Sequence, residues 1–310
     1  MDGILIVDKP EGLTSHDVVA RLRRILKMKR IGHTGTLDPF ATGVLVMLVG
    51  KATRLAQFLD KDKKEYEATI RFGFETDTGD RTGSPKSKVQ SPKSVSIDAL
   101  ENVLESFRGE IEQTPPMYSA KKVAGKKLYE LARKGIEIER KPVKVTIHKI
   151  EIINDQKPKT EDQETDDFGL WTLDFGLRVL CSAGTYIRTL AEDIGRKLEI
   201  GAHLSALRRT RAGIFDLSKA VTIEELDKIV SADELGKVII SMSAALAHLP
   251  KITLNETAIK DAQNGKKLKF EDAGFENNQT IRLVDEAGSL VAIGFYEKEQ
   301  KSIQPRIVLI

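Results

Sequence analysis

Cysteine is almost absent from this 310-residue chain, and its histidines are scattered. A single thiol, Cys181, cannot form an internal disulfide, and it excludes a cysteine cluster for zinc. The five histidines stand at 16, 33, 148, 203 and 248 with no HExxH spacing, so we expect no protein metal site. Phosphate-loop motifs are missing as well. No Gly-Lys-Ser/Thr follows the glycines near residue 35, which excludes a Walker loop, and the spacing of these glycines does not fit the dinucleotide-binding fingerprint.

Long apolar runs are also lacking. No run approaches the roughly 20 residues that span a bilayer. The N-terminus carries Asp2 where a signal peptide has basic residues, so we expect a cytoplasmic protein with no membrane partner. Apolar residues make up 40% and charged residues 31%, as in ordinary soluble proteins, and the length predicts two domains, or one large domain with a small appendage.

Positive charge is unevenly distributed, although the net charge is only +3. Taken singly, each basic cluster is more often a solvated face than a binding site, but four of them in one chain make a polyanion partner a serious hypothesis. The clusters are Arg21, Arg23, Arg24, Lys27, Lys29 and Arg30; Lys121, Lys122, Lys126 and Lys127; Arg208, Arg209 and Arg211; and Lys266, Lys267 and Lys269.

One stretch, residues 32–43, stands out by its glycines and its single acid. Its sequence is Gly-His-Thr-Gly-Thr-Leu-Asp-Pro-Phe-Ala-Thr-Gly. Glycine permits close approach of the backbone or a positive φ, and Pro39 biases Asp38 away from the α region, so Asp38 is expected on a shaped turn. An equally good interpretation from spacing alone makes Asp38 a helix N-cap and Pro39 the first helical residue.

The hydrophobic periodicity predicts an α+β protein. A buried strand is expected at 3–7, a helix begins at the capping box of Thr14 and Asp17, and Tyr66 lies on a half-buried alternating strand. Further strands are expected from 44, at 142–153 with a bulge near Lys149, and at 173–179; further helices at 52–59, 97–107, 126–134, 187–198 and 223–229. Residues 84–96 and the acidic segment 155–167 are expected as exposed excursions. Residues 250–310 predict a small β-rich unit with a helix at 257–264 and strands at 280–284, 290–296 and 306–310.

Several ordered motifs together resemble the TruB-type tRNA pseudouridine synthases, across nearly the whole chain. The motifs are Lys9-Pro10-Glu11-Gly12, Gly32 to Pro39, Tyr66 on its strand, Met117-Tyr118-Ser119-Ala120, Gly184-Thr185-Tyr186-Ile187-Arg188 and Leu207-Arg208-Arg209. The resemblance implies a pseudouridine synthase fold, with a mixed, largely antiparallel sheet flanked by helices in residues 1–248 and an RNA-contacting insertion at about 121–142. It also implies a C-terminal β-barrel-like PUA domain in residues 249–310.

The same resemblance implies a function and a set of site residues. The substrate would be the T-loop uridine of tRNA, position 55, converted to pseudouridine without a cofactor, by a chain that is expected to be a monomer with no obligatory protein partner. Asp38 would be the catalytic aspartate, Tyr66 the ring stacked on the target base, and Arg188 the cation paired with Asp38. His33, Tyr186 and Leu207 would line the pocket, Leu207 through its backbone. We expect Lys9 to be structural.

The chemistry of the isomerisation agrees with these residues. Moving a glycosidic bond from N1 to C5 needs a carboxylate and a proton acceptor but no redox agent, and a neighbouring arginine such as Arg188 favours the ionised form of Asp38. The sequence leaves open whether the carboxylate attacks C1′, attacks C6 or assists elimination to a glycal. Two other functions remain open: a non-catalytic RNA-binding or tRNA-folding module, and a guide-dependent pseudouridine synthase.

Overall fold

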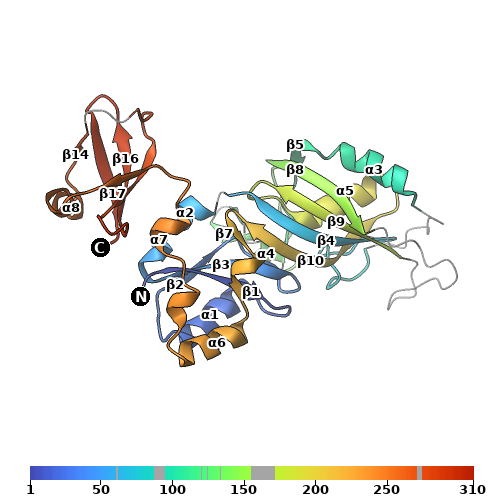
Figure 1. The fold of residues 1–310 in the computed structure, drawn as a ribbon. Helices are drawn as coiled ribbons and strands as arrows, with labels where there is room; N and C mark the ends of the chain where they lie inside the picture. The colour runs from blue at the N-terminus through green and yellow to red at the C-terminus, as the bar shows by residue number, and fades with distance from the viewer. Residues whose placement is uncertain are drawn as a thin grey trace.

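A ten-stranded mixed sheet forms the framework of the molecule (Figure 1). The computed structural model describes residues 1–60, 62–86, 95–119, 121–123, 125–132, 134–154, 172–270 and 274–310. Within these residues the strand order is β12-β1-β3-β10-β4-β9-β8-β5, with β2 added to β3 and β11 to β10. Most neighbours are antiparallel, whereas β1 with β12 and β3 with β10 run parallel. The predicted α+β class with a mixed, largely antiparallel sheet is therefore confirmed.

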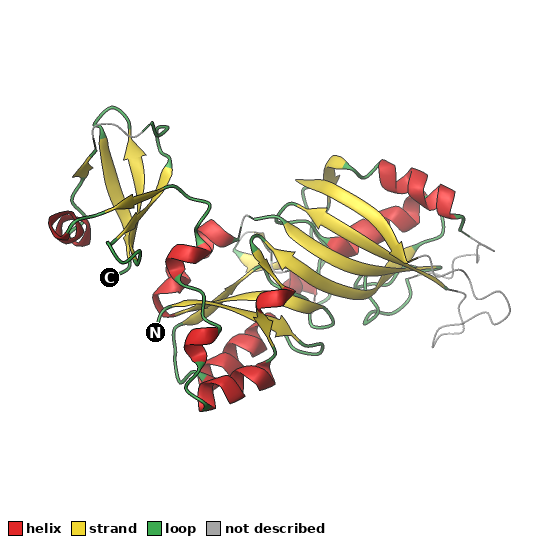
Figure 2. Ribbon diagram, in the orientation of Figure 1, coloured by secondary structure: helices red, strands yellow, loops and turns green. Residues whose placement is uncertain are grey.

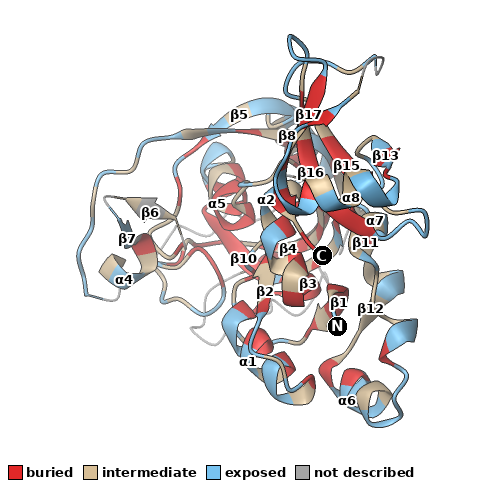
Figure 3. Cartoon of the chain, turned by 90° about the vertical axis from the view of Figure 1, so that its left-hand side faces the viewer, coloured by how far each residue is buried: buried red, intermediate tan, exposed pale blue. Residues whose placement is uncertain are grey.

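The N-terminal half of the sheet is built on strands that are buried on both faces. Its elements are β1 (Gly3–Lys9), α1 (Ser15–Ile25), β2 (Ile31–Thr34), β3 (Thr42–Val49), the 3-10 helix η1 (Gly50–Leu55), α2 (Ala56–Leu59), β12 (Ala220–Val221) and α6 (Ile223–Ser231). The predicted capping box opens α1, with Thr14 and Asp17 bonded reciprocally. Helices α1 and α6 lie side by side against β1 and β3, which are drawn as buried in Figure 3.

The second half of the sheet is half-buried and follows the predicted alternation. Its elements are β4 (Lys64–Phe72), α3 (Ile97–Glu105), β5 (Gly109–Gln113), β8 (Val143–Asn154), β9 (Leu173–Cys181) and α5 (Ile187–Lys197). Every second residue of β4 and β9 is buried, under α3 and α5 on one face of the sheet (Figure 2). The expected bulge in β8 is present, because the pairing register with β9 shifts between Ile147 and Lys149.

Strand β10 (Ala202–Ala212), which the sequence analysis did not predict, joins the two halves. It pairs antiparallel with β4 along its length and parallel with β3 at Arg208 and Arg209. The seam is very tight at Gly43: a Cβ there would lie 2.2 Å from the carbonyl oxygen of Arg209, and Gly43 has φ +99°. Glycine is therefore required at this crossing of β3 and β10.

Two other predicted elements differ in extent from the structure. The basic helix expected at 126–134 is shorter, because residues Lys126–Lys127 form β7 and pair with β6 (Lys122–Val123), and α4 spans only Leu128–Ala132. The expected last strand, 306–310, begins earlier as β17 (Ser302–Val308). Residues 87–94 of the predicted excursion 84–96, and all of 155–167, lie outside the described residues.

Residues after 250 form a five-stranded sheet of their own. Its strand order is β13-β15-β16-β17-β14. The remaining elements are β11 (Phe215–Asp216), η2 (Leu217–Lys219), η3 (Leu235–Lys237), α7 (Met242–Ala245), β13 (Lys251–Thr253), α8 (Glu256–Gln263), β14 (Leu268–Lys269), β15 (Thr280–Val284) and β16 (Leu290–Glu297). This sheet packs on the N-terminal half, since Leu290, Ile293 and Leu309 belong to the same apolar cluster as Val44, Val46 and Leu48 of β3. No helix in the described part of the chain is long and apolar enough to cross a membrane.

The seam at Gly43 gives a first prediction. Gly43→Ala should lower the free energy of unfolding by more than about 3 kcal/mol, because the new methyl group collides with main-chain atoms of β10 and φ is positive. Gly12→Ala is the matched control, because φ is +84° there but nothing lies within 4 Å of the new Cβ. Its free energy of unfolding should fall by only about 1 kcal/mol, the cost of a positive φ for alanine. Denaturant unfolding of both variants measures the difference, and equal losses would contradict the steric account.

Candidate active site

A pocket of about 270 Å³ opens where the two halves of the sheet meet. Its walls come from the loop after β2, the start of β4, the middle of β10 and the turn that leads into α5. The lining residues include Gly35, Asp38, Lys64, Tyr66, Ser119, Tyr186, Arg188, Leu207 and Arg209. The structure thus brings five of the six predicted site residues to one pocket.

Asp38 sits on a turn, not on a helix end. The Ala41 amide donates to the Asp38 carbonyl at 3.1 Å, which closes a four-residue β-turn with Pro39 in its second position, and β3 follows directly. The N-cap interpretation is therefore wrong. The hydroxyl of Ser15, at the start of α1, accepts from the Leu37 amide at 2.9 Å and so fixes the residue before Asp38.

Lys9 stabilises the same turn from below. Its ammonium group donates to the carbonyl oxygens of Pro10, Pro39 and Ala41, at 2.9, 3.1 and 2.6 Å, and the side chain is fully buried. Burial lowers the pKa of Lys9 to about 8, although the nearby charge of Asp38 opposes this. The structure thus places Lys9 beneath the Asp38 turn, as a residue that packs the loop.

Arg188 and Asp38 form a two-point ion pair at the pocket floor. Nε of Arg188 lies 2.9 Å from Oδ2 of Asp38, and Nη2 lies 3.1 Å from Oδ1. The arginine side chain is only 6% exposed, whereas that of Asp38 is 32% exposed, so a free edge of the carboxylate faces the pocket. Burial raises the pKa of Asp38, and the charge and hydrogen bond of Arg188 act in the opposite direction, toward the ionised form.

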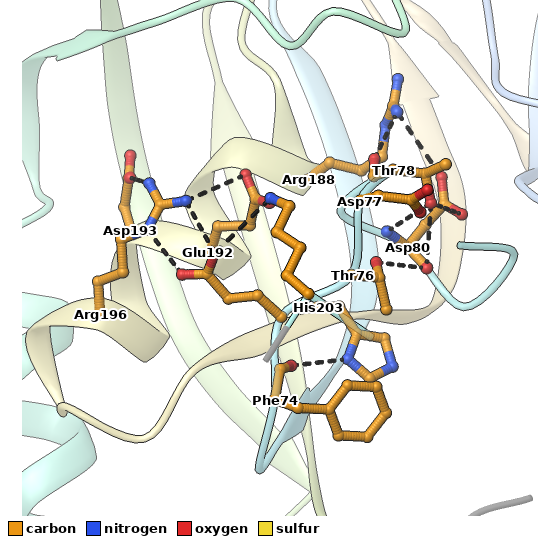
Figure 4. Close-up of polar contacts among 12 residues, drawn as sticks. Phe74, Thr76, Asp77, Thr78, Asp80, Arg188, Glu192, Asp193, Arg196 and His203 are labelled. Atoms are coloured by element: carbon orange, nitrogen blue, oxygen red, sulfur yellow. Dashed lines mark hydrogen bonds and ion pairs between the residues drawn. The ribbon is translucent and has the colours of Figure 1, made fainter. Parts of the chain in front are cut away.

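Arg188 is itself fixed by the loop between β4 and α3. Its Nη1 donates to the Thr78 carbonyl at 2.9 Å and lies 3.7 Å from the carboxylate of Asp80 (Figure 4), and its Nη2 donates to the Tyr118 carbonyl at 2.6 Å. Asp80 is buried and accepts from the hydroxyls of Thr78 and Thr82. Asp80, in an acidic, turn-rich stretch, is thus a second carboxylate beside Arg188 that was not among the predicted site residues.

The same loop is tied to α5 by a second set of ion pairs. Arg196 of α5 donates to both carboxylate oxygens of Glu75, at 2.7 and 3.1 Å, and Lys86 pairs with Glu192 at 3.0 Å (Figure 4). His203 of β10 contacts the carbonyl of Phe74 at the base of the loop. These contacts fix both ends of the loop on the helix that carries Arg188.

Tyr66, Tyr186 and Leu207 line the pocket on three sides. Tyr66 is 8% exposed, and burial raises the pKa of its phenol, opposed by the charge and hydrogen bond of Arg209. Tyr186 is the N-terminal flanking residue of α5, and the buried side chain of Gln113 holds its main chain by accepting from the amide at 2.9 Å and donating to the carbonyl at 3.1 Å.

His33 is the one predicted site residue that does not line the pocket. It lies in a neighbouring hollow with Gln57 and Asp60, beyond the wall formed by Gly35 and Thr36. Its ring packs edge-on against His16, with 5.4 Å between centroids. Burial and the neighbouring charges lower the pKa of His33, which favours the neutral imidazole.

Arg209 and Lys64 are pocket residues that the sequence analysis did not single out. Arg209, read there as part of a surface cluster, is 1% exposed, and its guanidinium donates to the carbonyls of Val44 at 2.7 Å and Gly35 at 2.8 Å. Lys64 is 5% exposed and donates to the carbonyls of Asp60 and Asp62. Arg208 pairs with Asp8 instead of projecting freely. Lys64 is in phase with Tyr66 and the other buried residues of β4, so the alternation could have indicated its inward side chain, whereas no strand was predicted around Arg209.

Comparison with known proteins places this site in a class. Two solved structures align over 99% of this chain and 85% of theirs: a Cbf5-Nop10-Gar1 complex, with a TM-score of 0.72 and 29% identity, and an H/ACA RNP bound to a substrate RNA containing 2′-deoxyuridine, with a TM-score of 0.71 and 27% identity. Family models match as well. Residues 23–187 match the N-terminal domain of TruB family pseudouridylate synthases, and residues 188–247 match the C-terminal domain of tRNA pseudouridylate synthase B.

The fold is that of the pseudouridine synthases. Curated relatives narrow the class further. tRNA pseudouridine synthase B of Geobacillus thermodenitrificans is 44% identical over 87% of this chain and 86% of its own, and that of Bacillus pumilus is 40% identical over 100% and 98%. The chain belongs to the TruB family and is a tRNA pseudouridine synthase, an isomerase.

The buried ammonium group of Lys9 predicts a specific pH dependence of stability. Its pKa is about 8 in the folded chain and 10.5 in the unfolded one, so between these values the unfolded state binds more protons and stability rises with pH. The free energy of unfolding of the wild type relative to Lys9→Met should therefore increase from pH 8 to 10.5, by about 1–2 kcal/mol after solvent screening. Urea unfolding of both proteins across this pH range measures the difference in free energy. A difference that does not change with pH would show that the pKa of Lys9 is not lowered in the folded chain.

Proposed function

We propose that the chain isomerises the T-loop uridine at position 55 of tRNA, with Asp38 as the catalytic carboxylate and no cofactor. The observation that supports this most directly is the two-point pairing of Asp38 with Arg188 at the floor of a pocket that Tyr66 also lines. Burial raises the pKa of this carboxylate, its arginine partner favours the ionised form, and its open edge faces the space for the sugar of the substrate. Moving the glycosidic bond from N1 to C5 of the base needs this carboxylate and an acceptor for the C5 proton.

A uridine stacked within the T-loop cannot present its base and its sugar to the residues of this pocket, so the target uridine must be flipped out. Extrusion costs a few kcal/mol of lost stacking, of which an aromatic ring recovers a part. Tyr66 is assigned this stacking role, Tyr186 and the backbone of Leu207 line the space for the base, and Arg188 holds Asp38. His33, in its adjacent hollow, is assigned to a flanking nucleotide instead of the flipped base.

Around this site the chain divides into two functional parts. Residues 1–248 form the catalytic domain, in which the segment 121–142 contacts RNA, and residues 249–310 form a PUA-like RNA-binding domain. The separate five-stranded sheet of the C-terminal residues supports this division. We assign the chain to the cytoplasm, where its tRNA substrate is made, and to a monomeric form that needs no guide RNA.

Turnover of a minimal substrate tests the assignment. The purified chain should convert the position-55 uridine of a T-arm stem-loop transcript to pseudouridine, because this pocket together with the T-arm contacts suffices for flipping and chemistry. Pseudouridine mapping after chemical derivatisation gives the readout, and a transcript with cytidine at that position is the control. Salt-dependent binding without product would favour the RNA-folding module, and product that appears only with added guide RNA and proteins would favour the guide-dependent class.

A single substitution separates catalysis from binding. Asp38→Asn should reduce turnover by at least about a thousandfold, roughly 4 kcal/mol of transition-state stabilisation, while the dissociation constant for the stem-loop changes only a few-fold. Asp227→Asn, at an exposed position on α6, is the control and should retain full turnover. Single-turnover kinetics and filter binding measure the two quantities. Parallel loss of binding and turnover in Asp38→Asn would assign Asp38 a structural role.

A further inference from the structure

Two buried cations share one wall of the pocket without a carboxylate partner. A Cβ built on Gly35 would lie 3.2 Å from Nη1 of Arg209 and 3.6 Å from Cε of Lys64, so the two side chains flank the same glycine. Their hydrogen bonds go to main-chain carbonyls: Val44 and Gly35 for Arg209, Asp60 and Asp62 for Lys64. Among the described residues, neither forms an ion pair with an acid.

This arrangement is costly in the free protein. Burying a charge without a counter-ion is unfavourable, and two like charges beside one another add repulsion. The pKa of Lys64 is lowered, by burial first and then also by the charge of Arg209, while Asp60 opposes the shift. Asp38 cannot serve as the counter-ion, because Arg188 already pairs with it. A pocket built in this way is prepared for negative charge that arrives with the substrate or develops during the reaction.

We propose that Arg209 and Lys64 form an anion-stabilising wall that holds the uracil ring as an anion after its bond to the ribose has broken. This inference rests on the proposed function. Both cations line the same pocket as Tyr66, and the positive charge of Arg209 opposes the rise that burial causes in the pKa of the Tyr66 phenol. In this proposal the Asp38–Arg188 pair acts on the sugar, and Arg209 and Lys64 act on the base.

The electron balance of the reaction shows why such a wall is useful. Heterolysis of the N1–C1′ bond leaves the electron pair on the base, where the charge spreads over N1, O2 and O4. The electron-deficient C1′ then forms a bond to the Asp38 carboxylate, or C2′ loses a proton to that carboxylate and a glycal forms. The base then turns and C5 supplies an electron pair to C1′, while the Asp38–C1′ bond breaks on the first route or C2′ regains its proton from Asp38 on the second. C5 finally loses its proton and N1 gains one. Fixed cations lower the energy of the anionic stage on either route, and no other reactant is consumed.

A small coloured base tests the wall independently of RNA recognition. The probe is free 5-nitrouracil, whose ring ionises in the weakly acidic range, and binding to the full chain is followed by its absorbance. Its affinity for the wild type should rise by at least about tenfold as the ring ionises, the effect of one opposite charge at close range. Uracil, which stays neutral over the same pH range, should show no such rise, and inorganic phosphate should not displace the bound probe.

Variants assign the effect to the two side chains. Arg209→Met and Lys64→Met should each remove most of the increase in affinity that follows ionisation of the probe. Arg209→Lys retains the charge and should keep this increase. If Arg209 were only structural, its Lys and Met variants would behave alike. Arg71→Met, on the same strand as Lys64 but paired with Asp174 at the sheet surface, is the control and should bind the probe as the wild type does.

Three results would overturn the proposal: equal affinity of the wild type for the neutral and ionised probe, no measurable binding, or a rise that persists in both Met variants. Because the two Met variants are independent, failure of one to fold leaves the other to decide. T-arm turnover by the wild type tests the proposed function separately. Anion binding without turnover would refute the position-55 assignment alone, and turnover without anion preference would refute the anion wall alone.

Discussion

The contact between Arg188 and Asp38 is the interaction on which the site depends. A carboxylate at the floor of a half-closed pocket would be driven toward its neutral form by burial, and the guanidinium opposes this by charge and by two hydrogen bonds. The arginine cannot turn away to solvent, because the carbonyls of Thr78 and Tyr118 hold it from the other side. Four segments distant in sequence are therefore committed to one geometry: the turn at 38–41, the loop after β4, the segment after β5 and the first turn of α5.

This interaction also explains how the two family-model segments relate to the fold. Their boundary falls between residues 187 and 188, inside the first turn of α5, so Asp38 belongs to the first segment and Arg188 is the first residue of the second. Strand β10, which separates β3 from β4, also comes from the second segment. The two segments are thus not separate bodies, since neither holds a complete site and the sheet of one is closed by a strand of the other.

Local patterns in the sequence were sufficient for much of this architecture. The capping box at Thr14, the alternation along β4 and the slip in β8 are each set by neighbouring residues, and each is present in the structure. The ordered motifs led to the pairing of Asp38 with Arg188, which periodicity alone would not reveal. What escaped prediction depends on tertiary contacts.

The main residues that the sequence did not predict at the site are charged. In β10 the run Arg208, Arg209, Thr210, Arg211 resembles a solvated face, but the middle arginine is buried because main-chain carbonyls of the loop after β2 and of β3 accept from it. Asp80 likewise meets Arg188 only when distant segments come together, whereas Lys64 donates to the carbonyls of Asp60 and Asp62, close to it in the sequence. A charged residue does not show by its type that main-chain carbonyls will hold it inside the protein. In this chain such residues line the pocket.

The apolar cluster shared by β3 and the C-terminal sheet has a mechanical consequence. Val44, Val46 and Leu48 of β3 share this cluster with Leu290, Ile293 and Leu309, and the same strand carries Gly43 against the backbone of Arg209. The C-terminal sheet is therefore linked to the strand that borders the pocket through one continuous apolar cluster. A cavity made in this cluster at the C-terminal sheet would therefore loosen the packing around the strand that carries Gly43.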